Sequence, residues 1–218
     1  MIVLNLKNYS ASFSRCLSLT DAAAKVSHDT GVRIIVCPPP THLNCSASMY
    51  KDVFAQHTDA FEQGAHTGYL IPEALKSINV KGSLVNHSEH RVGTENVGKT
   101  VSLLKTHGLE TVVCGENATE CAELAKFGPD YIAVEPPELI GSGISVSIAK
   151  PEIISSTVEA VKASNSAVKV LCGAGVSTRE DVKKSLELGA KGVLLASAYV
   201  KAKDPVKFLQ EFAGAFHP

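Results

Sequence analysis

The feature of the sequence that most restricts the fold is a regular alternation between short apolar runs, rich in β-branched residues, and longer stretches with helical periodicity. β-Branched residues favour strands, whereas apolar residues spaced three and four apart line one face of a helix. Repeated alternation of the two is typical of parallel β/α units. We predict eight strands, which cover residues 2–6, 33–37, 53–56, 83–85, 111–114, 131–134, 168–171 and 192–195.

The stretches between the predicted strands carry helix signals. Val97, Val101 and Leu104 form an apolar stripe, and Val182 and Leu186 form a shorter one. Glycine is favoured just after the end of a helix. A glycine of this kind precedes four of the predicted strands, namely Gly31, Gly108, Gly128 and Gly189.

Helix starts are marked as well. Pro151 and Pro205 suit the first turn of a helix, where the N–H that proline lacks has no helical partner anyway. Ser177 and Glu180 have the spacing of a capping box. The sequence contains no long linker, charge block or low-complexity tract, so we predict a single domain over residues 1–218.

Eight β/α units in one domain fit a closed (β/α)8 barrel better than an open doubly wound sheet. The open sheet normally has fewer strands and carries a glycine-rich dinucleotide loop after its first strand. Here the segment after the first predicted strand, residues 5–9, contains no glycine. The predicted fold class is therefore α/β, in the form of a closed barrel.

Composition excludes several classes of partner. The 218 residues include 21 basic and 22 acidic side chains, for a net charge of −1, so no overall field attracts nucleic acid or anionic lipid. Apolar runs fall short of the ~18 residues that span a bilayer, and the first residues do not resemble an export signal. The six cysteines form no CxxC pair, which favours a reducing compartment. We expect a cytoplasmic protein without nucleic-acid or membrane partners.

Polar or small residues follow five of the predicted strands. A barrel gathers the carboxyl ends of its strands at one rim, where barrel enzymes place their chemistry. Each such residue taken singly is more often an ordinary loop residue, but together they offer a cation, an imidazole and a carboxylate. The candidates are Asn5 and Lys7, His87 and Glu89, Glu135, Gly173 and Gly175, and Ala196 and Ser197.

The two glycines after the seventh strand suggest an anion site. Backbone N–H groups at the start of a helix bind phosphate well, and the loops after strands seven and eight are the common phosphate site of barrels. Gly173 and Gly175 lead toward a predicted helix, and Ala196 and Ser197 open the last unit. The alternative is that the glycines only form a tight turn.

Residues 135–143 have the composition of a moving lid. Glu135 is followed by two prolines, which limit backbone freedom, and then by Gly141 and Gly143, which permit it. An ordinary connection is the alternative, although one of this length is uncommon. We expect no metal site, because His87 and His90 have no third ligand of convincing spacing.

Several of these segments resemble the triosephosphate isomerase family, and more closely its short archaeal branch. The resemblance lies at the predicted strand ends and follows the order of the chain. It covers residues 5–7, 86–91, 135–143, 172–176 and 195–197. It implies a (β/α)8 TIM barrel that interconverts dihydroxyacetone phosphate and D-glyceraldehyde 3-phosphate through an enediolate, without a cofactor, in glycolysis and gluconeogenesis.

The same resemblance assigns roles to residues. Glu135 is implied as the base, His87 as the electrophile that polarises the carbonyl, and Lys7, with Asn5 beside it, as the positive charge near the substrate. The substrate-binding residues that it implies are Asn5, Leu6, Lys7, Ile140, Gly175, Ala196 and Ser197.

Five positions differ from the commonest pattern of the family. Asn86 stands where a glycine precedes the histidine, His90 where an arginine is usual, and Glu138 where many members have tryptophan; residues 196–197 replace two glycines. These changes leave the phosphate geometry open. Two other functions also stay open: a different phosphosugar isomerase or epimerase, and a phosphate-binding barrel without activity.

The resemblance implies a homo-oligomer as well. Family members associate through the loop after the third strand, which here is near residues 66–69. The chain is shorter than the ~250 residues of a typical barrel, so we expect subunit contacts to replace lost intrachain packing. This expectation favours a tetramer over a dimer.

Overall fold

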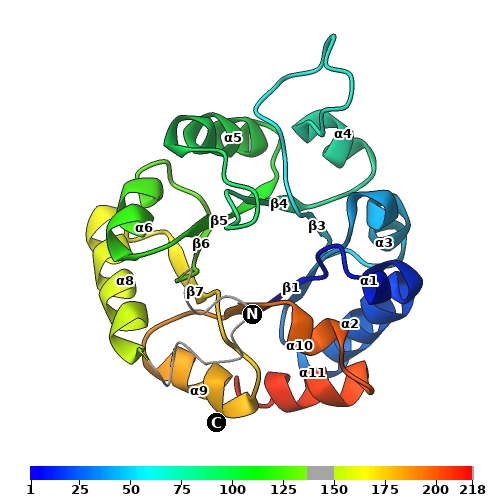
Figure 1. Cartoon of the computed structure of the whole chain (residues 1–218), viewed down its shortest axis with the longest axis vertical. Coiled ribbons are helices and arrows are strands. Elements are labelled where there is room, and N and C mark those ends of the chain that lie inside the picture. The colour runs from blue at the N-terminus through cyan, green and yellow to red at the C-terminus, as the bar shows by residue number, and fades with distance from the viewer. Residues whose placement is uncertain (137–149, 218) are drawn as a thin grey trace.

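The computed structural model describes residues 1–136 and 150–217. Its centre is a sheet of eight parallel strands in the order β2-β1-β8-β7-β6-β5-β4-β3. A parallel bridge between Val36 and Val53 joins the two outer strands, so the sheet closes into a barrel (Figure 1). The strands are β1 (Ile2–Asn5), β2 (Ile34–Cys37), β3 (Phe54–Ala55), β4 (Gly82–Val85), β5 (Glu110–Gly115), β6 (Tyr131–Val134), β7 (Lys169–Cys172) and β8 (Val193–Leu195).

Helices surround the barrel, which confirms the predicted (β/α)8 TIM barrel (Figure 1). Their bounds are α1 (Ser10–Ser14), α2 (Cys16–Thr30), the 3-10 helix η1 (Pro40–His42), α3 (Leu43–Met49), α4 (Pro72–Ser77), α5 (Thr94–Thr106), α6 (Ala118–Ala125), α8 (Pro151–Ser164), α9 (Arg179–Glu187), α10 (Ser197–Val200) and α11 (Pro205–Ala213). None of the helices in the described part of the chain is long and apolar enough to cross a membrane.

The predicted helix boundaries hold, with one correction. All four glycines expected after helices have a positive φ, and Pro151 and Pro205 begin α8 and α11. The capping box of α9, however, is formed by Thr178 and Asp181, so the predicted pair was wrong by one residue. The shorter Asp181 side chain also accepts hydrogen bonds from the Ser177 backbone and hydroxyl, which fixes this register.

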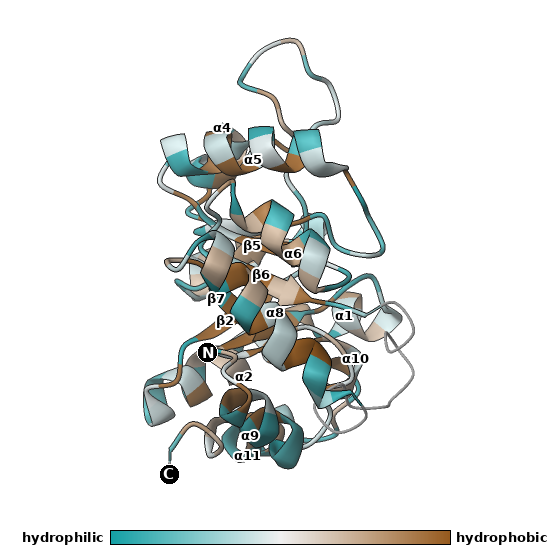
Figure 2. Ribbon diagram, turned by 90° about the vertical axis from the view of Figure 1, so that its left-hand side faces the viewer, coloured by the Kyte–Doolittle hydropathy of each residue, from teal (hydrophilic) through white to brown (hydrophobic). Residues whose placement is uncertain are grey.

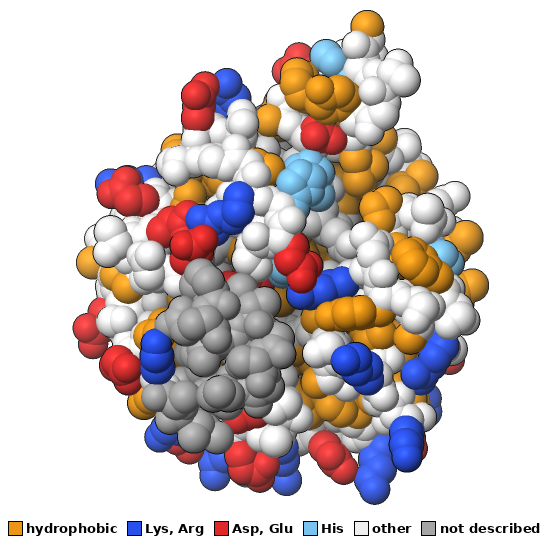
Figure 3. All heavy atoms as spheres, in the orientation of Figure 1, with side chains coloured by type: hydrophobic (Ala, Val, Ile, Leu, Met, Phe, Trp, Pro, Cys, Tyr) orange, Lys and Arg blue, Asp and Glu red, His pale blue; other side chains and the backbone are white. Residues whose placement is uncertain are grey.

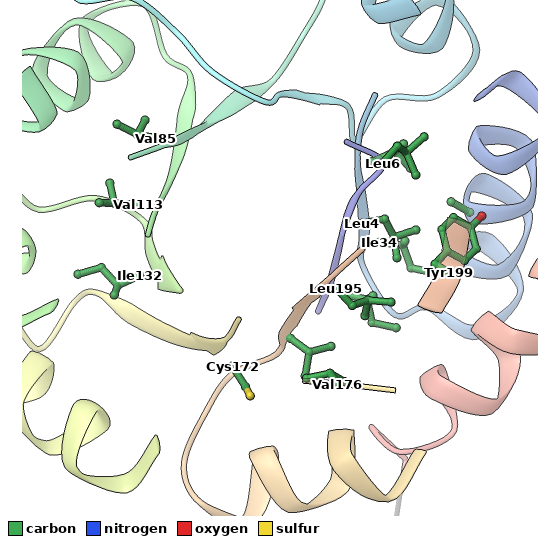
Figure 4. Close-up of a cluster of buried hydrophobic side chains, with 14 of the residues drawn as sticks. Leu4, Leu6, Ile34, Val85, Val113, Ile132, Cys172, Val176, Leu195 and Tyr199 are labelled. Atoms are coloured by element: carbon green, nitrogen blue, oxygen red, sulfur yellow. The ribbon is translucent and has the colours of Figure 1, made fainter. Parts of the chain in front are cut away.

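Because side chains alternate in direction along each strand, the buried residues form two clusters. One set of side chains points into the barrel, and it includes Val3, Ile35, Val112, Ala133 and Leu171. The residues between them point outward and pack against the helices, as the apolar side chains around β1, β2 and β8 do in Figure 4. Figure 2 shows hydrophobic colours on the strands and hydrophilic colours on parts of the surrounding helices. Every second residue of a strand therefore faces the barrel axis.

The amino-terminal end of the barrel carries an ion-pair cluster that the sequence did not reveal. Arg33 donates from Nε to Asp52 at 2.8 Å. Its two terminal nitrogens donate to Glu110 at 2.8 and 2.6 Å. The guanidinium also lies over the Phe54 ring, 5.8 Å from its centre. This cluster closes the end of the barrel opposite the strand termini that hold the candidate site.

The segment between β3 and α4 projects from the barrel, at the top of Figure 1. Its tip carries a small aromatic cluster, in which the rings of Phe61 and Tyr69 meet edge to face at 4.7 Å. Both side chains are exposed. Asp59 ties the base of the segment, since its carboxylate accepts from the Leu70 backbone N–H at 2.7 Å.

Candidate active site

A cleft lies at the carboxyl ends of the strands, where the sequence predicts the site. It encloses about 160 Å³ and opens to solvent. Small-molecule sites are typically concave, with a few polar groups that converge on the ligand. The lining residues are Lys7, Tyr9, His87, Glu135, Gly173, Ala174, Gly175, Val176, Ser177, Leu194, Leu195, Ala196, Ser197 and Ala198.

Glu135 enters the cleft because it continues the inward-facing positions of β6. It follows Ala133 by two residues, and its backbone N–H donates to the Gly115 carbonyl at 2.8 Å. The residue is 2 % exposed. A carboxylate this deeply buried is shielded from bulk water and can act on a ligand held in the cleft.

His87 lies against this carboxylate. Its Nε2 is 3.2 Å from Oε1 of Glu135. On the other side of the ring, Nδ1 accepts a hydrogen bond from the Glu89 backbone N–H at 3.1 Å. A nitrogen that accepts from an amide carries no proton, so the proton of the neutral imidazole is on Nε2. The ring therefore presents an N–H donor to the cleft.

Lys7 supplies a cation beside the histidine. The backbone at Lys7 is left-handed, with a φ of 49°, and the buried side chain of Asn5 holds it there by accepting from the Lys7 N–H at 3.0 Å. The Lys7 ammonium lies 2.7 Å from Oε1 of Glu89. Backbone strain of this kind is common at functional sites. Figure 3 shows cationic and acidic side chains adjacent near the centre of this face.

Cys114 is a neighbour of the site that sequence reasoning missed. It occupies an inward-facing position on β5, next to β6, and is fully buried. Burial, and then the Glu135 carboxylate, raise the pKa of the Cys114 thiol well above its usual value. The thiol thus stays protonated beside the base. Cys114 lies two residues after Val112, so the alternation of inward-facing residues along this strand could have predicted its place beside the site.

Small residues form the other wall of the cleft, as the anion-site prediction requires. Gly175, with a φ of 68°, follows β7, and Ala196 and Ser197 follow β8. The two loops meet because β7 and β8 are paired. Ser177, predicted only as a residue that caps the start of a helix, also lines this wall. With few side chains in the way, backbone N–H groups on this wall are accessible to an anion.

Three predicted residues lie elsewhere. Leu6 is fully buried among apolar side chains between the barrel and its helices, so its side chain packs in the core and does not line the cleft. Asn5 lines a neighbouring groove together with Gln56 and His57. Ile140, and with it the predicted lid after Pro136, lies outside the described residues.

Metal chemistry has no support among the described side chains, where no group of three His, Cys, Asp or Glu residues converges on one point. The cleft instead combines a buried carboxylate, an N–H donor on an imidazole and a nearby ammonium. This set can remove a proton next to a carbonyl and stabilise the negative charge that develops on oxygen.

Comparison with known proteins agrees with this chemistry. A family model described as triosephosphate isomerase matches residues 1–212. The chain is 48% identical over 213 residues to the triosephosphate isomerase of Methanothermus fervidus, covering 97% of this chain and 96% of that protein. It is 47% identical to the one from Methanocaldococcus jannaschii, with 97% of each chain covered, and 44% identical over 216 residues to that of Cenarchaeum symbiosum, with 99% and 97% covered.

Proposed function

Because the chain belongs to the triosephosphate isomerase family, we propose that it interconverts dihydroxyacetone phosphate and D-glyceraldehyde 3-phosphate. The observation that carries this proposal is the pair formed by Glu135 and His87, whose Oε1 and Nε2 are 3.2 Å apart in a glycine-walled cleft. A carboxylate and an imidazole N–H at this separation can act together on two adjacent atoms of a small substrate.

In the proposed reaction, Glu135 removes a proton from the carbon next to the carbonyl. The electron pair of the broken C–H bond forms a carbon–carbon double bond, and the π electrons of the carbonyl move onto its oxygen, which becomes an enediolate oxygen. The Nε2–H of His87 donates to that oxygen and moves protons between the two oxygens. Glu135 then returns its proton to the neighbouring carbon, so the reaction is an isomerisation with no net loss of atoms or charge.

The remaining polar groups bind the substrate in this proposal. The Lys7 ammonium, held in place by Glu89, balances negative charge on the substrate oxygens and phosphate. The backbone at Gly175, Ala196 and Ser197 binds the phosphate. Exclusion of water matters as well, because an exposed enediolate next to a phosphate can eliminate it. Ile140 is proposed as a further phosphate contact on sequence resemblance alone.

A coupled assay with Glu135→Gln tests the proposal. Loss of the base is expected to lower kcat by about 100- to 10,000-fold, the usual contribution of general base catalysis. The matched control is Glu123→Gln, at an exposed α6 carboxylate that pairs with Lys126 on the surface, which should keep full activity. Full activity of Glu135→Gln would overturn the proposal. Turnover of other phosphosugars, with none of the trioses, would assign a different isomerase.

We also propose that the enzyme is a single domain over residues 1–218 that serves glycolysis and gluconeogenesis in the cytoplasm as a homotetramer. Exposed Phe61 and Tyr69 on the projecting segment support self-association, since aromatic side chains are enriched in interfaces. Sedimentation velocity should give the mass of four chains, and an active monomer at dilute concentration would refute the oligomer.

A further inference from the structure

The backbone next to the catalytic histidine has an unusual conformation. Among the described residues, those other than glycine with a positive φ are Lys7, Asn79 and Asn86. Asn86 has a φ of 61° and directly precedes His87. Left-handed backbone is unfavourable for most side chains and is tolerated best by asparagine and aspartate. The commonest pattern of the family has glycine here, which reaches this conformation freely.

Asn86 differs from glycine in having a side chain, and both of its polar atoms are used. Oδ1 accepts from the Val92 backbone N–H at 3.0 Å. Nδ2 donates to the Cys114 carbonyl at 3.0 Å. The residue is only 3 % exposed. One amide thus connects the loop after β4 with the end of β5, in a place where an unpaired polar atom would be costly.

The loop after β4, which the bond from Val92 to Asn86 holds, sets the orientation of the His87 ring. The chain turns sharply after the histidine, where the His90 N–H donates to the His87 carbonyl at 2.7 Å. Within this turn the Glu89 N–H donates to Nδ1 of the ring. Because Val92 ends the same loop, the bond from Val92 to Asn86 closes it into a fixed shape.

The strand held on the second side, β5, supports the base, which follows the neighbouring strand β6. Cys114 lies beside Glu135, and the next residue, Gly115, accepts the Glu135 backbone N–H at 2.8 Å. The Asn86 amide therefore touches the supports of both members of the catalytic pair, although it does not line the cleft itself.

We propose that Asn86 is a positioning residue, whose side chain fixes the His87 ring and its Nε2–H donor relative to the Glu135 carboxylate. The proposal rests on the proposed isomerase function. Where glycine supplies only the backbone conformation, asparagine supplies the conformation together with two hydrogen bonds that limit how the β4 loop moves against β5.

Kinetics of Asn86→Gly test this role. Glycine keeps the left-handed backbone and removes both side-chain bonds, so the histidine becomes less well aligned while the phosphate wall is untouched. We expect kcat to fall about 10-fold, in line with the cost of small misalignments of catalytic groups, with KM unchanged. The matched control is Asn79→Gly, which makes the same substitution at a φ of 63° on an exposed residue after α4; its kcat should equal that of the wild type.

A second variant keeps the test decisive if Asn86→Gly does not fold. Asn86→Asp tolerates the same backbone and keeps the acceptor for Val92, but it places a carboxylate oxygen against the Cys114 carbonyl. We expect a folded enzyme with kcat at least about threefold lower and KM unchanged, since only one of the two links is broken.

Nuclear magnetic resonance of ¹⁵N-labelled histidine separates positioning from plain stability. In the wild type, Nδ1 of His87 should have the shift of an unprotonated nitrogen, and in Asn86→Gly the two ring nitrogens should move toward an average of the tautomers. Wild-type kcat and ring shifts in a folded Asn86→Gly or Asn86→Asp protein would overturn the inference. An inactive wild type would instead refute the proposed function, so the two failures are distinguishable.

Discussion

The two ends of the barrel both carry ionisable side chains, yet they use them differently. At the amino-terminal end, the Arg33 side chain is 33% exposed and Glu110 is 34% exposed. At the carboxyl end, the His87 and Glu135 side chains are only 7% and 3% exposed. Arg33 has three short hydrogen bonds to carboxylates, whereas the buried Glu135 receives a bond of 3.4 Å from the Ser88 N–H and the contact with His87.

The more deeply buried end is therefore the one whose charged groups are less fully paired. In a structural ion pair, desolvation is offset by short bonds that use most of the donors and acceptors. In a site that must bind a ligand, some of this capacity stays free and faces a cleft. A charged residue near a strand end therefore does not by itself indicate function. Its unused hydrogen-bonding groups and its access to a cavity distinguish a ligand-binding site from a structural ion pair.

The largest effect that separates the ends is expected for Arg33→Ala. The change leaves Asp52 and Glu110 close together without their cation, so the free energy of unfolding should fall by about 2–4 kcal/mol, somewhat less than for a fully buried pair. The kcat of the folded enzyme should not change, because this end has no part in the chemistry. Urea denaturation and the coupled assay measure the two quantities.

Lys81→Ala is the control for Arg33→Ala. Lys81 is an exposed cation at the same end of the barrel, and its loss should change stability by less than about 0.5 kcal/mol. A loss of kcat in folded Arg33→Ala would show that the two ends are coupled and would break the distinction drawn between them.

A smaller effect is expected from adding one methyl group at either end. In Gly173→Ala the new Cβ would lie 2.7 Å from Cγ of Glu135 and 2.9 Å from the Val134 carbonyl oxygen. The carboxylate must shift, so we expect kcat to fall about 10-fold and the free energy of unfolding to fall by about 1–3 kcal/mol. Steady-state kinetics and urea denaturation provide the two measurements.

Gly82→Ala makes the matching change at the amino-terminal end. Its Cβ would lie 2.3 Å from the Glu110 carbonyl oxygen and 2.7 Å from the Phe54 ring. Stability should fall by a similar amount, about 1–3 kcal/mol, while kcat stays at the wild-type value. If Gly82→Ala lowered kcat as much as Gly173→Ala, the effect on activity could not be assigned to Glu135.

The sequence predicted the barrel well because the relevant signal is local. Each strand is a short apolar run, and the predicted strands overlap the observed ones throughout. β3 is shorter than predicted, with only Phe54 and Ala55 in the ladder. The meeting of Lys7, His87 and Glu135 in one cleft was predictable for a related reason, because the strands end at one rim.

What the sequence could not supply depends on distant contacts. Arg33 and Glu110 are 77 residues apart and meet only because the barrel brings β2 and β5 to the same end. The tautomer of His87 depends on a backbone turn that places the Glu89 N–H on Nδ1. The capping box of α9 had two adjacent residue pairs of suitable spacing, and the contacts of Asp181 with Ser177 decide between them.

The packing of Glu135 against the β7 backbone also bears on the handedness of the product. The side chain lies so close to Gly173 and Val134 that not even a methyl group fits behind it. A single carboxylate held in this way reaches a flat enediolate from one face only. In the proposed reaction it both removes and returns the proton on that face, so the new stereocentre forms as one enantiomer and the enzyme makes no racemic aldehyde.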